Sequence, residues 1–461
     1  MPILAGFMVP HPPMIVPDIG RGEENKIIKT IQAYERVADE VAKLKPDTIL
    51  ISSPHSIMYA DYFHISPGAK ARGSFERFGA GNVRFEESYD GEPRDRICSY
   101  AEEDGFPSGT LGERDPKLDH GTMVPLYFIR QKYPEGRIIR IGLSGLPLSD
   151  HYRLGMYIAR AVEDLNRKTV FIASGDLSHK LQDYGPYGYV KEGPEYDRRI
   201  MDVCSRAAFN ELFDFDEAFC EKAAECGHRS FVMMAGAFDG LSVKAEALSH
   251  EDVTGVGYGI CSFYPQGKDE GRHFLLEHEK NKEAEIQERR ANADAYVRLA
   301  YQAVDYYVLH RRYLPLPEDI EKELIDRKAG TFVSIHKEGL LRGCIGTIGP
   351  TRDNIALEII ANAVSACSRD PRFSPVRPEE LKDLEISVDV LGETEDISSP
   401  EELDVKRYGV IVSHGNRRGL LLPDLDGVDT VEQQIDIARA KGGIGEEEDY
   451  TLQRFEVIRH Y

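Results

Sequence analysis

The sequence contains no tryptophan, only 7 cysteines among 461 residues, and far fewer basic than acidic side chains. The cysteines are odd in number and scattered from Cys98 to Cys367, so they do not form the pattern of a disulfide framework. With 57 Lys and Arg against 79 Asp and Glu, the formal net charge is −22. This charge disfavours nucleic acid, because phosphate contacts need clustered basic residues. We therefore expect reduced thiols and no nucleic-acid partner.

Long apolar segments and targeting signals are also missing. No stretch of the sequence reaches the ~18–20 uninterrupted apolar residues of a membrane span. The first residues, Met1 to Gly6, lack the basic segment followed by an apolar one that is typical of a secretory signal. These features predict a cytoplasmic protein without a membrane partner.

The length and the changes of pattern along the chain indicate two domains. A chain of 461 residues exceeds the size at which one hydrophobic core usually keeps growing. Residues 1–265 alternate short, β-branched apolar segments with helical ones, which predicts an α/β fold with a largely parallel sheet. Residues 266–290 are strongly charged and predict an exposed, partly helical linker. Residues 291–461 mix helices and strands without βαβ regularity, which predicts an α+β domain.

Several segments can be assigned to single elements. In the first domain, the predicted strands cover 47–52, 137–143 and 168–173, and the predicted helices cover 27–44 and 152–165. In the second domain, apolar residues at helical spacing predict a helix over 296–307. A further helix is expected at 354–368, with strands at 330–336, 341–346 and 385–391.

Three histidines of the first domain follow short apolar runs. His11 stands in Val-Pro-His-Pro-Pro, His55 in Ser-Ser-Pro-His-Ser, and His179 ends the segment Ser-Gly-Asp-Leu-Ser-His. Ligands of parallel sheets gather at the carboxyl ends of strands, so these side chains are expected at one edge. Prolines beside His11 and His55 restrict the backbone, which helps a metal ligand to keep its position. Two histidines and one carboxylate suit Fe(II) with open positions for substrate and O2.

Five segments of the first domain follow one another in a fixed order: Pro10–Pro13, Ser53–Ser56, Asp119–Gly121 with Pro125 and Leu126, Ser174–His179, and Glu225–His228. Through these segments, residues 1–265 resemble the class III extradiol ring-cleaving dioxygenases of the LigB type and their metal-binding Memo relatives. The resemblance implies that His11 and His55 bind iron. It also implies that His179 is the base that takes a proton from a catechol-like substrate, an aromatic diol, and that His120 contacts the substrate or supports the site.

The third metal ligand is left open. The dioxygenases use a glutamate at this point and the Memo branch uses a cysteine, whereas this chain offers both, as Glu225 and Cys226. Adjacent residues on a helix point about 100° apart, so one of the two is expected to reach the metal. The preferred interpretation is Glu225 with Fe(II). With Cys226 the site would be softer and would suit another divalent metal or copper.

Four short segments of the second domain stand out in order along the chain: Leu341–Gly346, Asp370–Phe373, Ile386–Leu391 and Gly419–Pro423. Through these segments, residues 291–461 resemble the AMMECR-type domain. Arg342 is a candidate to hold an anion, and Cys344 is a candidate nucleophile beside it, with His414 as a candidate partner. The alternative is a tight packing corner with a buried cysteine. In the family this domain recurs with Memo-like and radical SAM proteins, which implies a radical SAM partner.

Two functions are predicted. The leading hypothesis is a non-haem Fe(II) enzyme that opens the ring of a catechol-like, or other oxidisable, small molecule with O2. The alternative is a metal-binding accessory or modification protein that works with a radical SAM partner and cleaves no ring.

Overall fold

The computed structural model describes residues 2–425 and 427–461 and separates the chain into two units, with the boundary between Glu279 and Lys280. This boundary lies inside the predicted linker 266–290. The segment is largely regular structure: strand β10 (Tyr258–Lys268) enters it, and helix α9 (Phe274–Asn292) follows. Phe274 and Leu275 are buried in the core of the first unit, so that unit extends beyond residue 265.

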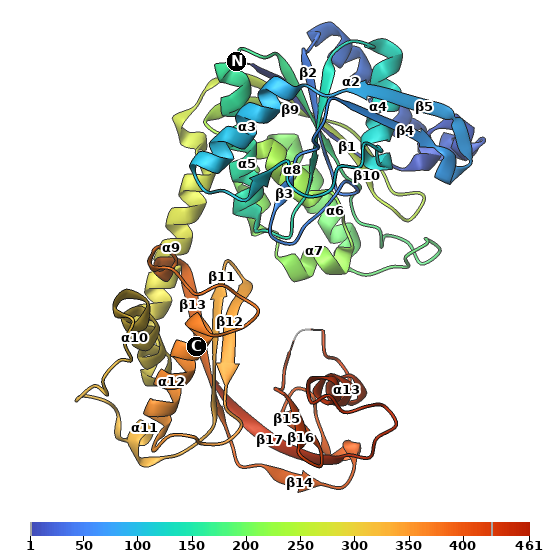
Figure 1. The fold of residues 1–461 in the computed structure, drawn as a ribbon. Coiled ribbons are helices and arrows are strands. Elements are labelled where there is room, and N and C mark those ends of the chain that lie inside the picture. The colour runs from blue at the N-terminus through green and yellow to red at the C-terminus, as the bar shows by residue number, and fades with distance from the viewer. Residues whose placement is uncertain (1, 426) are drawn as a thin grey trace. The chain divides into compact units, whose positions relative to one another are not determined.

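A six-stranded sheet in the order β7-β2-β8-β1-β10-β9 forms the centre of the first unit (Figure 1). Four neighbouring strands are parallel: β1 (Ile3–Val9), β2 (Thr48–Ser53), β7 (Arg137–Gly142) and β8 (Thr169–Ser174). Two antiparallel strands complete one side, β10 and β9 (Leu241–Glu251). The prediction of a largely parallel sheet is therefore confirmed, and β2, β7 and β8 match the predicted strands.

Helices cover both faces of this sheet, which explains why its parallel strands are apolar on both sides. One face packs against α2 (Ile28–Leu44) and α4 (His120–Lys132). The other packs against α3 (Gly91–Glu103), α5 (Leu148–Asp164), α6 (Glu192–Arg206) and α8 (His228–Gly236). The remaining short elements are α1 (Pro17–Gly20), α7 (Glu217–Ala223), the pair β3 (Phe63–His64) and β6 (Ser108–Gly109), and the hairpin β4 (Lys70–Phe75) and β5 (Ala80–Ser88).

The second unit is built on a curled antiparallel sheet in the order β12-β11-β13-β17-β15-β16, with β14 paired to β17. Its strands are β11 (Thr331–Lys337), β12 (Leu340–Gly346), β13 (Leu384–Leu391), β14 (Glu395–Ile397), β15 (Tyr408–His414), β16 (Arg417–Leu421) and β17 (Thr451–His460). Its helices are α10 (Ala295–His310), α11 (Lys322–Asp326), α12 (Ile355–Ser368) and α13 (Val431–Lys441). Helices α10 and α12 pack on β11 and β13, and α13 packs near β15 and β16, as expected for an α+β domain.

None of the helices in the described parts of the chain has both the length and the apolar character needed to cross a membrane.

Candidate metal centre

His11 follows the end of β1, and its side chain is buried. Its Nδ1 lies 3.0 Å from the Ser174 hydroxyl, and that hydroxyl donates to the Gly121 carbonyl oxygen at 2.6 Å. Because the serine proton goes to the carbonyl, the Ser174 oxygen accepts from Nδ1–H of His11. The Nε2 atom of His11 then keeps its lone pair, which is the state that a metal ligand needs.

Two further donor atoms meet Nε2 of His11. His55 Nε2 lies 3.0 Å away and Cys226 Sγ lies 3.6 Å away. The three atoms all lie within 4.8 Å of one another, which makes these residues a group able to hold a metal ion. Strands β1 and β2 flank β8, so both histidines stand at the carboxyl edge of the parallel strands. His11 is buried and His55 is exposed, so the group opens to solvent on the His55 side.

Glu225, the preferred third ligand of the sequence analysis, does not join this group. Its carboxylate accepts the backbone N–H of His228 at 2.6 Å and lies 3.5 Å from the Tyr196 hydroxyl. Burial raises the pKa of Glu225 to about 7. The carboxylate thus satisfies an N–H at the start of α8, which has no partner within the helix. The preference for Glu225 is therefore corrected: Cys226 is the residue beside His11 and His55.

A close backbone contact holds Cys226 at the site. The Cys226 sulfur accepts the backbone N–H of Asp176 at 3.3 Å, and Asp176 in turn accepts the backbone N–H of His11 at 2.7 Å. A Cβ atom on Gly175 would lie 2.1 Å from the Cα atom of Gly227, so this approach requires glycine. The segment after β8 thereby links the ligand of β1 to the loop that carries the thiol.

The other two predicted histidines lie at the same edge. His120 begins α4, and its ring centroid lies 4.0 Å from that of His55 and 5.4 Å from that of His11. Burial lowers the pKa of His120 to about 3, so this imidazole is neutral at physiological pH. His179 Nε2 lies 4.0 Å from Asp176 Oδ2, and its ring stacks on Tyr187 with centroids 5.2 Å apart. Burial also lowers the pKa of His179.

Two family models match the chain, one for each unit. The model described as the catalytic LigB subunit of aromatic ring-opening dioxygenase matches residues 5–261, and the AMMECR1 model matches residues 297–460. The chain belongs to the LigB family. Its LigB domain is followed by an AMMECR1 domain, so both resemblances found in the sequence are confirmed.

Several proteins are similar to this LigB–AMMECR1 chain. Protein CA_C1420 of Clostridium acetobutylicum is 42% identical over 98% of both chains. A protein of Thermotoga maritima is 50% identical over 167 residues, which are 36% of this chain and 96% of that protein. Among solved structures, PH0010 from Pyrococcus horikoshii shares 30% identity, covers 36% of this chain and 88% of its own, and has a TM-score of 0.34. JW3007 from Escherichia coli K12 shares 15% identity, covers 56% of this chain and 99% of its own, and has a TM-score of 0.37.

Sequence reasoning missed three residues that support the LigB site. Ser174 and Asp176 lie in the Ser-Gly-Asp-Leu-Ser-His segment, which was assigned only through His179. Tyr187, which is 59% exposed, stands in the run Tyr-Gly-Pro-Tyr-Gly-Tyr at 184–189. This exposed, tyrosine-rich run was the available indication of an aromatic side chain beside His179, and Tyr187 is the residue of the run whose ring stacks on it.

A pocket of about 870 Å³ opens beside His55 and His120. We call it the hairpin pocket, because β4, β5 and their connection form much of its wall. Its lining includes Ser56, Ile57, Arg72, Gly73, Ser74, Glu76, Arg77, Phe78, Arg84, Phe85, Glu113, Asp115, Lys117, Leu118, Asp119, Met123 and Arg140, in addition to the two histidines. The metal group therefore has a neighbouring space large enough for a small-molecule substrate.

Arg342 of the AMMECR1 domain is not available to hold an anion. Its guanidinium pairs with the buried carboxylate of Glu380 at 2.9 Å and donates to the Ser374 carbonyl oxygen at 2.8 Å. The expectation of an anion site at Arg342 is therefore corrected, because an internal carboxylate already occupies this side chain.

Cys344 lies in a packed environment rather than beside a base. Its thiol accepts a hydrogen bond from Ser334 at 3.3 Å, its backbone N–H donates to Asp370 at 2.9 Å, and burial raises the pKa of the thiol. His414 instead contacts the Asp449 carbonyl and lies 3.9 Å from Glu448. A thiol with a raised pKa is a poor nucleophile, so these contacts favour the packing alternative.

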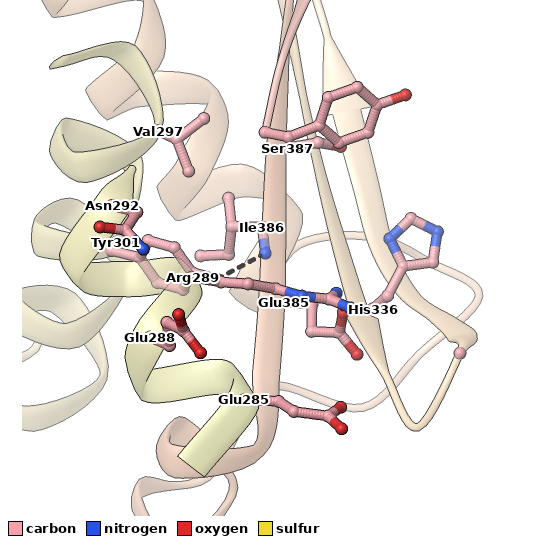
Figure 2. A pocket seen from close by; sticks show the side chains of 12 residues that line it. Glu285, Glu288, Arg289, Asn292, Val297, Tyr301, His336, Glu385, Ile386 and Ser387 are labelled. Atoms are coloured by element: carbon pink, nitrogen blue, oxygen red, sulfur yellow. Dashed lines mark hydrogen bonds and ion pairs between the residues drawn. The ribbon is translucent and has the colours of Figure 1, made fainter. Parts of the chain in front are cut away.

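A second pocket, of about 630 Å³, lies within the AMMECR1 unit between α9, α10 and β13 (Figure 2). The Tyr301 hydroxyl accepts the Ile386 N–H at 3.0 Å and donates to the Leu384 carbonyl at 3.3 Å. Tyr301 thus provides hydrogen-bond partners for backbone groups of β13 that β17 does not pair with. Glu385 and Arg289 form an ion pair in this wall. Neither Arg342 nor Cys344 lines the pocket.

Proposed function

We propose that the LigB domain binds one transition-metal ion through His11, His55 and Cys226 and catalyses an oxidoreductase reaction on a small molecule. One observation carries the proposal: three donor atoms from three separate segments converge within 4.8 Å. The bond from His11 to Ser174 supports it, because it turns the Nε2 lone pair toward the other two donors.

The donor set bears on the choice of metal. It has two imidazoles and a thiol, and it lacks the carboxylate of the set expected for Fe(II) oxygenases. Imidazole and thiolate ligands together suit copper and zinc, and imidazole also suits iron, so the Fe(II) expected from the sequence stays a prediction. A bound metal would supply Lewis acidity and, in the case of copper or iron, one-electron redox chemistry.

The chain's own residues provide the proton chemistry. His179 is neutral near pH 7, because burial lowers its pKa, so its Nε2 can accept a proton from a hydroxyl group of the substrate. The carboxylate of Asp176, 4.0 Å away, would then stabilise the imidazolium. The neutral ring of His120 beside His55 offers a further hydrogen-bonding contact to the substrate.

The metal-binding residues are tested by the metal content of full-length protein purified anaerobically. We expect Cys226→Ala to weaken metal binding by at least about tenfold, because one of three ligands is lost. Glu225→Gln should retain the metal, since the amide oxygen can still accept the His228 N–H. Cys220→Ala is the matched control, because Cys220 is a buried cysteine on neighbouring α7 outside the group. Loss of metal in Glu225→Gln with retention in Cys226→Ala would refute the proposal.

Ring cleavage and an accessory role are the two finer alternatives. Membership of the LigB family supports O2-dependent opening of a catechol-like ring. The thiol ligand supports a metal-binding accessory or modification protein with a radical SAM partner, a partnership that rests on the family resemblance. O2 uptake by metal-loaded protein with a catechol panel separates them. Uptake that His179→Gln abolishes favours ring cleavage, and no uptake at full metal occupancy favours the accessory role.

A further inference from the structure

The hairpin pocket has an unusual charge for this chain. Five basic and four acidic side chains line it, although the whole protein carries a net charge of −22. Asp119 is already engaged, because its carboxylate accepts from Ser53 at 2.6 Å and from the Thr122 N–H at 2.9 Å. Asp115 accepts the backbone N–H of Lys117 at 2.9 Å. Asp119 also lies 3.6 Å from the Arg140 guanidinium. Glu76 and Glu113 line the pocket as well, but among the described residues Arg72, Arg77, Arg84 and Lys117 form no ion pair with an acidic side chain.

Two of these basic side chains belong to residues whose backbones form a β-bridge with each other. Arg72 of β4 forms a parallel bridge with Lys117, in which the Arg72 N–H donates to Pro116 at 3.0 Å and the Leu118 N–H donates to Arg72 at 2.9 Å. Side chains of bridged residues project to the same face, and like charges in this position are destabilising. Both side chains line the hairpin pocket.

Acidic neighbours do not neutralise this pair. Within the described residues, neither Arg72 nor Lys117 forms an ion pair through its side chain, and the same holds for Arg77 at the other side of the pocket. Glu86 stands opposite Arg72 on β5 and projects to the same face, but its carboxylate pairs with Lys70 at 3.4 Å and forms no ion pair with Arg72. The cationic groups are thus free to contact a ligand.

The backbone that carries Lys117 is held in place by a buried arginine. Arg140 is 2% exposed, and its guanidinium donates to the Lys117 carbonyl at 2.6 Å, to the Asp115 carbonyl at 3.3 Å and to the Ser66 hydroxyl at 2.7 Å. Arg140 therefore fixes the segment from one side, while Arg72 pairs with it from the other. Because this backbone segment is already ordered, less conformational entropy of the protein is lost when a ligand binds to it.

The pocket connects the cationic pair to the metal group through aromatic rings. Phe78 is 38% exposed, and its ring meets His120 edge-on with centroids 5.5 Å apart. His120 in turn packs on His55. A ligand with an aromatic or other flat body could lie along these rings, with its reacting end at the metal group and a charged substituent at Arg72 and Lys117.

We infer that the substrate of the LigB domain carries a multiply charged oxyanion of the phosphate-monoester type, bound by Arg72 and Lys117 in the hairpin pocket. This inference rests on the proposed function, because it assigns the substrate of the same site. A carboxylate would neutralise only one of the two cations, whereas a phosphate monoester balances both. Arg72 matches two phosphate oxygens with its planar guanidinium, and Lys117 adds a point charge.

The test compares phenyl phosphate with benzoate as probes, by isothermal titration calorimetry on the full-length protein as purified. We expect phenyl phosphate to bind at least about tenfold more tightly than benzoate. The double variant Arg72→Gln/Lys117→Gln should lose at least about tenfold in phenyl phosphate affinity and less in benzoate affinity, because a carboxylate neutralises only one of the two cations. The matched control is Lys29→Gln/Arg198→Gln, which removes one exposed lysine and one exposed arginine outside the pocket.

The outcomes separate this inference from the proposed function. Equal phenyl phosphate affinity in the wild type and the Arg72/Lys117 variant would overturn the inference, as would benzoate binding as tightly as phenyl phosphate, or no phenyl phosphate binding at all. Metal content is measured on the same samples. The phenyl phosphate titration is repeated after metal removal, and an unchanged affinity excludes direct binding of phosphate to the metal. A protein that holds metal normally but fails these tests refutes the oxyanion site alone. A protein that holds no metal refutes the proposed function.

Discussion

Replacement of Gly175 by alanine tests how the metal group is assembled. The added Cβ atom would lie 2.1 Å from the Cα atom of Gly227, and the obstacle is backbone that no side-chain rotation can remove. Restoring an ordinary contact of 3.4 Å requires the two segments to separate by about 1.3 Å. Gly175 directly precedes Asp176, and Gly227 directly follows Cys226, so the separation moves the thiol away from the bond that positions it.

The size of the expected effect follows from this displacement. Metal–ligand distances tolerate deviations of only about 0.2 Å, so a shift of about 1.3 Å removes Cys226 from the ligand set. We therefore expect Gly175→Ala to lower metal affinity by about 10- to 100-fold, as disruption of the groups that orient metal ligands commonly does. The overpacked contact should also lower the free energy of unfolding by ~1–3 kcal/mol.

Metal affinity is measured by competition with a chelator, and unfolding by urea titration of metal-free protein. Gly91→Ala serves as the control, because Gly91 begins α3 and an added Cβ meets only the flexible end of Arg94, at 3.4 Å. That variant should bind metal like the wild type. If Gly175→Ala kept the metal affinity and stability of the wild type, the claim that the close contact between Gly175 and Gly227 positions Cys226 would be refuted.

Two further predictions concern single contacts. Ser174→Ala removes the acceptor of His11 Nδ1–H, so it should weaken metal binding by ~10–100-fold in the same chelator assay; an unchanged affinity would contradict the assigned orientation of His11. Arg372 lowers the pKa of Asp370 to about 2 from the ~3.9 of an unfolded chain, so the carboxylate stabilises the fold above that unfolded value and its contribution is lost as pH falls toward 2. The stability difference between the wild type and Asp370→Asn, measured by urea unfolding, should therefore be constant above about pH 5 and shrink between pH 4 and 2, and a difference independent of pH would contradict it.

The parallel part of the sheet was predictable because its strands are buried on both faces. The segments 47–52, 137–143 and 168–173 are short apolar runs bounded by turn residues, and they match β2, β7 and β8, in that order, within one or two residues. The full extent of helix α9 is harder to predict from the sequence, because most of its residues are charged or polar and only Phe274, Leu275 and Ile286 are buried. A helix without a continuous apolar stripe gives no periodic pattern to detect.

The second domain shows a different limit of sequence reasoning. A motif with an arginine near a cysteine is compatible with an anion site, and Leu341–Gly346 contains no acidic residue that could pair with Arg342. The partner that excludes it is Glu380, which lies 38 residues further along the chain and is buried beside Arg342. Local pattern identified the residues of this corner, but only the tertiary contact shows that the charge of Arg342 is already neutralised.

The choice between Glu225 and Cys226 depends on the backbone that joins two helices. Helix α7 ends at Ala223, and Ala224 adopts a left-handed conformation with φ of 53°, so Glu225 and Cys226 do not continue the helix. The side chains of these two residues are therefore not held at the 100° separation of adjacent residues on a helix. Glu225 turns to the first N–H of α8, and this bond leaves Cys226 on the side of His11. The glutamate thus acts on the metal group indirectly, because it fixes the loop from which the thiol projects.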